Sequence, residues 1–333
     1  MSDRVAVPGA PEIPGLVFRR GRGAADYAGS TEAFNRSLAA DGIDFALTVD
    51  EVAHWYEHAS GWDPATDEVI IEHEGRIAGF AVVRHVPDSD GTEVYGLQCG
   101  LVPELRRKGI GTALLALNMR RARERATAEV PGASVLLHAG TPETAPGAIA
   151  LYEGAGFTVA RYFFDMVQPD ISRLPDLPMP DGLEVRPVLP DHHRAIFAAD
   201  SEAFRDHWGG IDESEAAFGR YFSGPAFRPE LWRVAWDGAE VAGVVMVRPL
   251  DAYNAVHGAR RVEINGVSVR RPWRGRGLAR ALVADALRGA REAGFTSATL
   301  GVDAENPTGA LGVYEAVGFA VSQRHRAYRR PLN

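Results

Sequence analysis

Two short runs of basic residues and glycine are the parts of this chain best suited to bind an anion. They read Arg106-Arg107-Lys108-Gly109-Ile110-Gly111 and Arg274-Gly275-Arg276-Gly277-Leu278-Ala279. Each follows an apolar run typical of a strand and opens a stretch in which alanine and leucine recur at helical spacing. A helix N-terminus presents unpaired N–H groups and the positive end of the helix dipole, and glycine lets a phosphate approach the backbone. Each run therefore predicts a phosphate-binding turn.

A glycine turn that merely joins a strand to a helix is the simpler interpretation of one copy. Neither the dinucleotide-binding pattern nor the P-loop pattern is present, which argues against both classes. However, each turn is followed by a second shared run, Leu151-Tyr-Glu-Gly-Ala-Gly-Phe157 in one half and Val313-Tyr-Glu-Ala-Val-Gly-Phe319 in the other. The chain therefore contains a duplicated unit.

The elements that must position the turns occur in the same order in each half. A first strand near Gly15 or Gly182 is followed by helices and by a hairpin with its turn at Glu74-Gly75 or Asp237-Gly238. A strand, the glycine turn and its helix come next. A further strand (134–138 or 297–302), a short helix carrying a tyrosine, and a last strand complete each half. This order predicts an α+β fold, each half a mixed, mainly antiparallel sheet flanked by helices.

A segment between the halves predicts the domain boundary. Residues 168–181 contain four prolines, which fix φ and remove backbone donors, so they predict a semi-extended linker. The expected domains are therefore residues 1–167 and 182–333.

Composition excludes several classes of protein. The net charge of −8 over 333 residues argues against nucleic acid as a partner, and no apolar run reaches the roughly 20 residues that span a membrane. The N-terminus lacks the pattern of a signal peptide, so we expect a cytoplasmic protein. The single cysteine, Cys99, excludes an internal disulfide and a cysteine-based zinc cluster, and the spacing of the ten histidines predicts no metal site.

Both halves resemble the GCN5-related N-acetyltransferase (GNAT) family, and the resemblance covers nearly the whole chain. It rests on residues 101–111 and 269–279 for the turn, and on 152–157 and 314–319 for the tyrosine segment. The resemblance implies two tandem GNAT domains, acetyl-CoA as the donor, an amine as the acceptor, and direct transfer within a ternary complex.

The resemblance also implies which residues hold CoA. The pyrophosphate would lie against the backbone of the turns, and the pantetheine would run beside the strand ends, where the sheet splays. The cofactor residues implied in the first half are Leu101, Val102, Arg106, Arg107, Lys108, Gly109, Ile110, Gly111 and Thr112; those in the second are Val267, Val269, Arg274, Gly275, Arg276, Gly277, Leu278, Ala279, Asn306 and Tyr314. Thr144 takes the place of Asn306 in the first half.

Catalysis requires that an ammonium lose a proton and that a thiolate leave. The resemblance implies Glu263, six residues before Val269, as the general base, and Tyr314 and Tyr152 as general acids. Tyr95 is expected at the Glu263 position of the first half, with Glu93 on the same strand face. The alternative roles are a solvated strand carboxylate for Glu263 and core aromatics for the tyrosines.

Three other features have simpler interpretations. Cys99 is expected to be a small buried hydrophobe rather than a nucleophile. Residues 120–125, rich in arginine, are expected on a solvated helix face, with the 3′-phosphate of CoA as an alternative contact. The aromatic residues of the second half divide between core and acceptor wall; they are Phe204, His207, Trp208, Tyr221, Phe222 and Phe227.

The sequence thus predicts an N-acetyltransferase that moves acetyl from acetyl-CoA to the primary amine of a small molecule. The second half is the expected catalyst, because Glu263, Asn306 and Tyr314 accompany its turn. A non-catalytic acyl-CoA sensor or structural protein remains an alternative, favoured by Tyr95 and Thr144, as does a protein or peptide N-acetyltransferase.

The duplication also predicts the oligomeric state. A linker of about 15 residues keeps the halves at millimolar effective concentration, so we expect an intramolecular pseudo-dimer that is a monomer in solution. The symmetry is imperfect, because 43 residues lead from Gly109 to Tyr152 but 37 from Gly277 to Tyr314. We expect the extra residues in a loop at 127–134.

Overall fold

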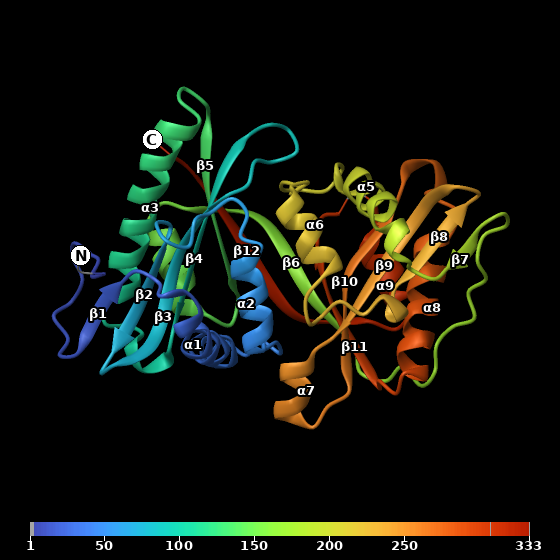
Figure 1. Cartoon of the computed structure of the whole chain (residues 1–333), viewed down its shortest axis with the longest axis horizontal. Helices are drawn as coiled ribbons and strands as arrows, with labels where there is room; N and C mark the ends of the chain where they lie inside the picture. The colour runs from blue at the N-terminus through green and yellow to red at the C-terminus, as the bar shows by residue number, and fades with distance from the viewer. Residues whose placement is uncertain (1–2, 307, 333) are drawn as a thin grey trace. The chain divides into compact units, whose positions relative to one another are not determined.

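The computed structural model describes residues 3–306 and 308–332 (Figure 1). The chain divides into two compact units. Unit 1 comprises residues 1–161 together with 325–333, and unit 2 comprises residues 162–324. Within the described ranges, no helix is long and apolar enough to cross a membrane.

Unit 1 is a mixed sheet with helices on both faces. Helices α1 (Tyr27–Ala40) and α2 (Val49–Glu57) cover one face, and α3 (Ile110–Glu129) and α4 (Pro146–Gly154) cover the other (Figure 1). The pair β4–β5 is parallel, and the other described pairs are antiparallel. The strands lie in the order β1 (Leu16–Arg19), β2 (Glu68–His73), β3 (Arg76–His85), β4 (Glu93–Leu101), β5 (Val135–Pro142) and β12 (Ala320–Pro331).

Unit 2 repeats this plan. Helices α5 (His193–Phe204) and α6 (Glu215–Phe222) cover one face, α8 (Leu278–Glu292) and α9 (Ala310–Glu315) cover the other, and α7 (Asp251–His257) joins β9 to β10. The pair β10–β11 is parallel. The strands lie in the order β6 (Thr158–Gln168), β11 (Ser297–Asp303), β10 (Arg261–Val269), β9 (Glu240–Pro249), β8 (Arg233–Asp237) and β7 (Glu184–Arg186). The α+β class and the two-domain layout predicted from the sequence are confirmed.

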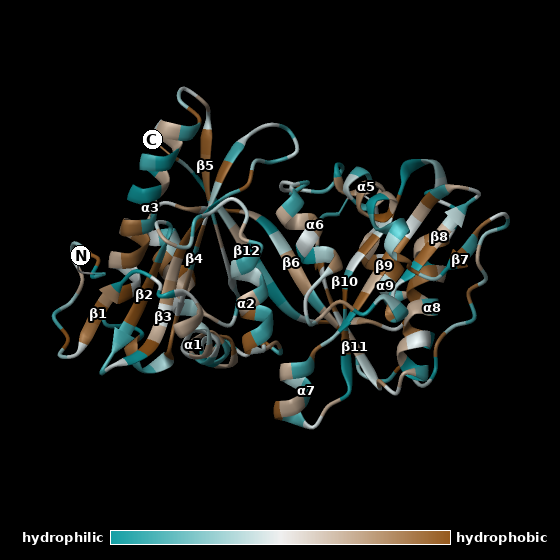
Figure 2. Cartoon of the chain, viewed as in Figure 1, coloured by the Kyte–Doolittle hydropathy of each residue, from teal (hydrophilic) through white to brown (hydrophobic). Residues whose placement is uncertain are grey.

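Apolar side chains of the central strands and of one helix in each unit form the cores. In Figure 2 the hydrophobic colour follows the central strands, whereas the helices carry hydrophilic patches on their outer sides. Helix α8 buries Leu278, Leu282 and Ala286 at helical spacing against Val245 and Ile264 of the sheet. The hairpin turn at Glu74-Gly75 is as predicted, with positive φ at both residues, whereas the second turn lies one residue later, at Gly238-Ala239.

The last strand of each half ends in the other unit. Strand β6 begins in unit 1, and its residues Phe163–Gln168 pair with β11 of unit 2. Strand β12 begins in unit 2, and its residues His325–Pro331 pair with β5 of unit 1. Met166 of β6 and Tyr328 of β12 lie in these paired segments and are fully buried. The bounds of the compact units therefore differ from the expected domain bounds, because long-range strand pairing decides where each sheet is completed.

The proline-rich segment packs on unit 2 and is not an exposed linker along its whole length. Ile171 is fully buried in the unit 2 core, and its N–H donates to the Thr296 carbonyl at 3.0 Å. Arg291 of α8 donates to the Ser172 carbonyl at 3.1 Å. The segment has no helix or strand, as expected of a proline-rich sequence, but it belongs to the fold of unit 2.

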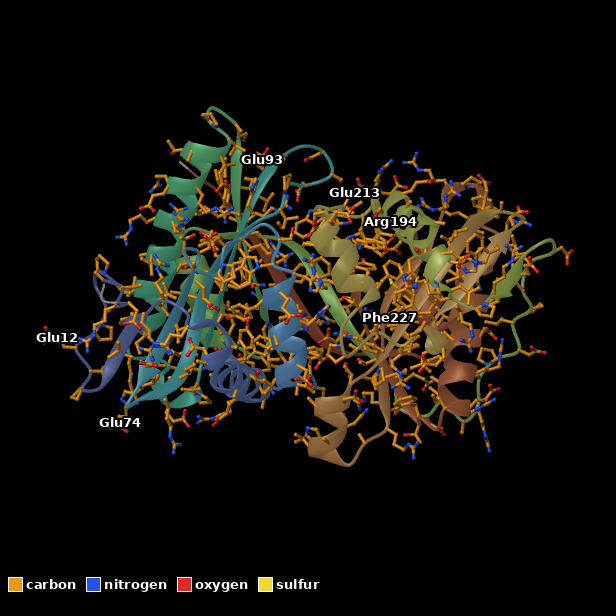
Figure 3. The ribbon with its side chains drawn as sticks, viewed as in Figure 1. Glu12, Glu74, Glu93, Arg194, Glu213 and Phe227 are labelled. Carbon is orange, nitrogen blue, oxygen red and sulfur yellow. The ribbon has the colours of Figure 1, made fainter. Side chains whose placement is uncertain are left out.

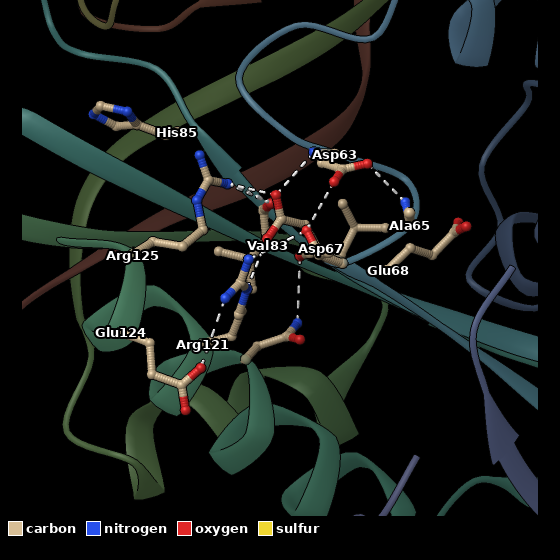
Figure 4. A network of polar contacts seen from close by, with 12 residues as sticks. Asp63, Ala65, Asp67, Glu68, Val83, His85, Arg121, Glu124 and Arg125 are labelled. Carbon is tan, nitrogen blue, oxygen red and sulfur yellow. Dashed lines mark hydrogen bonds and ion pairs between the residues drawn. The ribbon is translucent and has the colours of Figure 1, made fainter. Parts of the chain in front are cut away.

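The arginine-rich end of α3 is solvated only in part: Arg120 and Arg123 are exposed as expected, but Arg125 is not. The helix continues to Glu129, so it has 20 residues against 15 in α8, and most of the extra length lies in the helix, not in the expected loop. Arg125 is buried rather than solvated. Its guanidinium contacts Asp67 at 3.0 Å and Glu129 at 2.7 Å, and Arg121 contacts Asp67 at 2.8 Å (Figure 4). This network holds α3 against the start of β2.

The strand exchange predicts which fragment folds alone. A fragment of residues 158–324 keeps β6 and Ile171, so we expect it to be soluble and to unfold cooperatively on heating. A fragment of residues 182–333 lacks both and leaves the end of β12 unpaired, so we expect it to aggregate or to give no cooperative transition. Circular dichroism with thermal melts compares the two; cooperative unfolding of residues 182–333 alone would contradict this division of the chain.

Candidate active site

The two parallel strands at the centre of each unit separate after a few residues. Strand β10 pairs with β11 through Arg261–Ile264, and β4 pairs with β5 through Glu93–Gly96. Beyond these residues β10 keeps its ladder only with β9, and β4 only with β3, among the described pairs. The edges of residues 265–269 and 97–101 therefore offer backbone N–H and C=O groups to a ligand with amide groups, such as a pantetheine arm.

Each open edge leads directly to a predicted phosphate-binding turn. A 3-10 helix, Pro103–Leu105 or Arg271–Trp273, follows the strand, and the long helix begins after Gly109 or Gly277. These two glycines have φ of 86° and 85°, and neither helix start has a side-chain cap. The N–H groups of the first turn are thus available to an anion. Arg107 takes a left-handed φ of 61°, where unit 2 has Gly275 at 73°.

The first arginine of each turn makes the same contacts in both units, which we call the arginine brace: a hydrogen bond to the preceding strand and an ion pair with an aspartate. Arg106 Nε donates to the Leu101 carbonyl at 2.9 Å, and its guanidinium contacts Asp41 at 2.6 Å. Arg274 repeats this, with Nε to the Val269 carbonyl at 2.8 Å and a contact to Asp206 at 2.7 Å. These arginines fix the turn to the preceding strand and helix. Their side chains are engaged with protein, so anion binding falls to the backbone.

Arginine also determines the charge state of the brace in unit 2. Hydrogen bonds from Arg271 and Arg274 hold the pKa of Asp206 far below its usual range. The carboxylate therefore remains ionised near neutral pH, and its ion pairs with the two arginines persist there.

The tyrosines predicted as general acids are buried on the α3 or α8 side of their sheets. Burial raises the pKa of Tyr314 to about 12, and its ring lies 6.2 Å from that of Phe319. Burial also raises the pKa of Tyr152, with Cys99 and Tyr328 contributing. Both phenols are therefore protonated at neutral pH, as a proton donor must be. The same burial also fits the alternative role of a core aromatic.

Cys99 is not the buried hydrophobe that the sequence predicts. Its side chain is exposed on β4, on the unpaired edge of that strand. Surrounding protein nevertheless raises the pKa of its thiol to about 12 by desolvation. The thiol therefore lies in an enclosed position that solvent still reaches, and it is protonated and unreactive at neutral pH.

A β-bulge distinguishes the two units at the predicted base. The register of β10 against β9 shifts between Ile264 and Gly266, whereas β4 pairs with β3 without interruption. Glu263 pairs with Arg248. Met246 lies two residues before Arg248, and so on the same face of the strand, and it packs in the cluster with α5. Glu263 therefore lies on the α5–α6 face. Its carboxylate contacts the Arg248 guanidinium at 2.5 Å.

The expectation that Tyr95 occupies the Glu263 position is wrong, because the bulge shifts the count by one residue. Arg84 is the counterpart of Arg248, and its strand partner is Gly96. Tyr95 instead faces α3, where its hydroxyl donates to Glu129 at 2.9 Å and its ring stacks on His85. A one-residue shift in a strand reverses the face of a side chain.

Unit 1 therefore has no carboxylate at the site of Glu263. Glu93, expected on the same strand face as Tyr95, contacts His85 Nε2 at 2.6 Å at the beginning of β4. Figure 3 labels Glu93, the first residue of β4. The histidine contact places Glu93 in the same polar cluster as Tyr95.

The residues that precede the tyrosine helices serve local structure. Asn306 Oδ1 accepts hydrogen bonds from the Thr308 N–H at 2.9 Å and the Thr308 hydroxyl at 2.6 Å. Thr144 donates instead to the carbonyl of Asp41, the residue that holds Arg106. The two positions thus have different partners in the two units.

Aromatic residues pack between α5, α6 and the sheet of unit 2. Phe222 lies 4.3 Å from the His193 ring and 5.6 Å from Trp232, so this part of the expected acceptor wall is core. Arg194, labelled in Figure 3, lies 3.7 Å from the Phe218 ring. Trp208 lies beyond this core, 5.8 Å from Phe163 of β6. Trp208 is therefore not part of the core that Phe222 and Trp232 form.

Two buried acids that the sequence did not single out lie on the helix-covered faces opposite α3 and α8. Burial raises the pKa of Asp200 to about 6 and that of Glu68 to about 7. Asp200 accepts hydrogen bonds from Tyr221 and Ser268, and Glu68 accepts one from Tyr56. Sequence offered no signal for them, because each becomes buried through contacts between distant segments.

Comparison with known proteins identifies the class. The acetyltransferase (GNAT) family matches residues 39–157 and 194–319, so the chain belongs to this family and is an acyltransferase. It is 30% identical over 284 residues to a mycothiol acetyltransferase of Nocardiopsis dassonvillei, covering 78% of this chain and 80% of that protein.

Solved structures agree on the fold. A GCN5-related N-acetyltransferase from Sphaerobacter thermophilus superposes with a TM-score of 0.72 at 24% identity, over 96% of this chain and 97% of that one. A tandem GNAT protein from the clavulanic acid biosynthesis pathway gives 0.66 at 18% identity, over 96% and 99%.

Paired glycine variants test both turns. In Gly109→Ala and Gly277→Ala a Cβ meets no neighbouring atom, but it strains the left-handed backbone by about 1–2 kcal/mol. We expect wild type to bind two CoA molecules in calorimetry, and each variant to weaken one of the two sites by about tenfold. The two variants control for each other's stability cost. A single CoA per chain, lost in only one variant, would remove the other turn from the cofactor site.

The buried acids predict a pH dependence of stability. Because the folded-state pKa of Glu68 and Asp200 is raised, folding favours their protonated forms, and this contribution is lost as pH rises towards about 7. We expect thermal unfolding to show the double variant Glu68→Gln/Asp200→Asn gaining stability relative to wild type between pH 4.5 and 8, on the order of 1–3 kcal/mol. A difference that is constant with pH would rule out titration as the cause.

Proposed function

We propose that the chain transfers acetyl from acetyl-CoA to the primary amine of a small molecule, and that unit 2 performs the reaction. The observation that carries the proposal is the β10 bulge. It puts Glu263 on the α5–α6 face of a strand whose other edge is open to the donor. Unit 1 has Gly96 at this position.

The donor site of unit 2 fits CoA by its backbone chemistry. The open edge at 265–269 offers amide groups to pantetheine, and the uncapped start of α8 at Gly277 offers N–H groups to the pyrophosphate. Gly275 and Gly277, both with positive φ, leave this backbone without side-chain cover. Acetyl-CoA supplies an activated thioester carbonyl.

The proposed reaction has three coupled events. Glu263, directly or through a water molecule, takes a proton from the acceptor ammonium. The amine nitrogen attacks the thioester carbonyl, forming the amide and breaking the carbon–sulfur bond. Tyr314 donates its proton to the leaving thiolate, which its raised pKa permits at neutral pH. Arg248 holds the Glu263 carboxylate in position through the ion pair.

Unit 1 has a different proposed role. Its turn and open strand edge match those of unit 2, but Gly96 supplies no base and Tyr95 faces α3. This favours a unit that binds acyl-CoA without turnover, or one that serves the fold through β12. Its Tyr152 would then be a core residue.

The name of the mycothiol acetyltransferase relative supports a small molecule as acceptor. The net charge of −8 favours a cationic acceptor over nucleic acid. We propose that the protein acts in the cytoplasm as a monomer. An acetyl-CoA assay with free-thiol detection, run across aminoglycosides, polyamines, amino acids, amino sugars and peptides, identifies the acceptor class and would reveal a peptide acetyltransferase instead.

Two substitutions test the assignment once an acceptor is found. Glu263→Gln and Tyr314→Phe remove the base and the acid, and we expect each to lower kcat/KM by roughly 100-fold or more, with the KM for acetyl-CoA little changed. Glu240→Gln and Tyr253→Phe are matched controls in the same unit. If both test variants keep full activity while Tyr152→Phe loses it, catalysis belongs to unit 1.

A further inference from the structure

The C-terminal end of α2 gathers three metal-ligand side chains. His54, Glu57 and His58 each offer a ligand atom, and these atoms lie within 4.8 Å of one another. The sequence analysis found no metal-ligand spacing among the histidines. Yet positions three and four apart on a helix are neighbours on one face, which is what brings these three together.

The helix that carries the cluster is fixed before any ion arrives. Thr48 and Glu51 form a capping box at its N-terminus, and Val52 is buried against the rest of unit 1. The His54 and His58 rings lie 4.3 Å apart. Binding an ion therefore needs side-chain adjustments only, with no ordering of the backbone.

The hydrogen bonding of His58 favours metal coordination. Its Nδ1 lies 3.2 Å from the His54 carbonyl oxygen, so Nδ1–H donates and Nε2 keeps its lone pair. Metal-binding histidines commonly donate their other ring N–H to a backbone carbonyl in this way, which fixes the tautomer and the ring orientation.

The donor set selects the kind of ion. Two imidazoles and one carboxylate suit Zn²⁺, Cu²⁺ or Ni²⁺, whereas Mg²⁺ and Ca²⁺ prefer oxygen ligands. Glu57 is exposed and the histidines are half-buried, so an ion can reach the cluster from solvent. Three protein ligands also leave a coordination position for water.

We propose that His54, Glu57 and His58 form a binding site for one divalent transition-metal ion of the zinc type. The site lies on α2 of unit 1, apart from the proposed catalytic residues of unit 2. It is therefore independent of the proposed acetyltransferase reaction, and a catalytically inactive protein would still bind the ion.

Calorimetry with Zn²⁺ tests the site on the full-length chain, freed of tags and treated with chelator. We expect one Zn²⁺ per chain. His54→Ala and His58→Ala should each weaken binding by at least about tenfold, since even outer-shell changes cost about that much. Glu57→Gln keeps the side-chain size and should weaken binding while leaving the helix intact.

A control removes two imidazoles elsewhere. His73→Ala/His257→Ala should bind Zn²⁺ as wild type does, and circular dichroism should show all variants folded. A Co²⁺-loaded wild type should give visible absorption bands of a low-coordinate site, absent from the His58→Ala protein. The proposal is overturned if wild type binds no Zn²⁺ at millimolar concentration, or if the cluster variants bind as tightly as the control.

Discussion

In each unit the two central parallel strands diverge, and among the described residues the backbone groups beyond the point of divergence have no partner strand on that edge. The pairs β4–β5 and β10–β11 each run for four residues and then diverge. Backbone polar groups rarely remain unsatisfied in a fold. A strand edge left open beside a helix N-terminus is therefore suited to bind a ligand that supplies the missing hydrogen bonds. The arginine brace, the short 3-10 helix and the left-handed glycine before each long helix all maintain this opening. They hold the first N–H groups of α3 and α8 at the end of the open edge.

The two units share this arrangement of strand, turn and helix, but one inserted residue in β10 changes which side chains face the helices α5 and α6. The β10 bulge turns Glu263 towards the α5–α6 face, and the uninterrupted β4 turns Tyr95 towards α3. Side chains alternate along a strand, so a one-residue shift changes the face of every residue on one side of it. The duplicated fold can thus keep the same strand and turn geometry twice and place a carboxylate on this face once. Bulges often occur beside active sites for this reason.

The features predicted correctly from the sequence are those set by local physics. The glycine turns that open α3 and α8, the hairpin at Glu74-Gly75 and the tyrosine helices each depend on a few adjacent residues. The features missed depend on distant partners. Counting six residues back from the turn could not reveal the bulge, because a bulge is defined by the register of the neighbouring strand. Arg125 looks like a solvated helix residue until Asp67, far away in the sequence, packs against it.

The strand exchange gives each half of the chain a structural role in the other unit. Strand β12 follows the helix of Tyr314, and its final residues, His325–Pro331, complete the sheet of unit 1. Residues Phe163–Gln168 of β6 in turn complete the sheet that carries Glu263 and the open edge. Each half therefore supplies a buried strand that the other cannot replace, since an unpaired strand position in a sheet interior exposes both core and backbone. Selection on the fold of either unit therefore acts on both halves, because each half is required for the strand it donates.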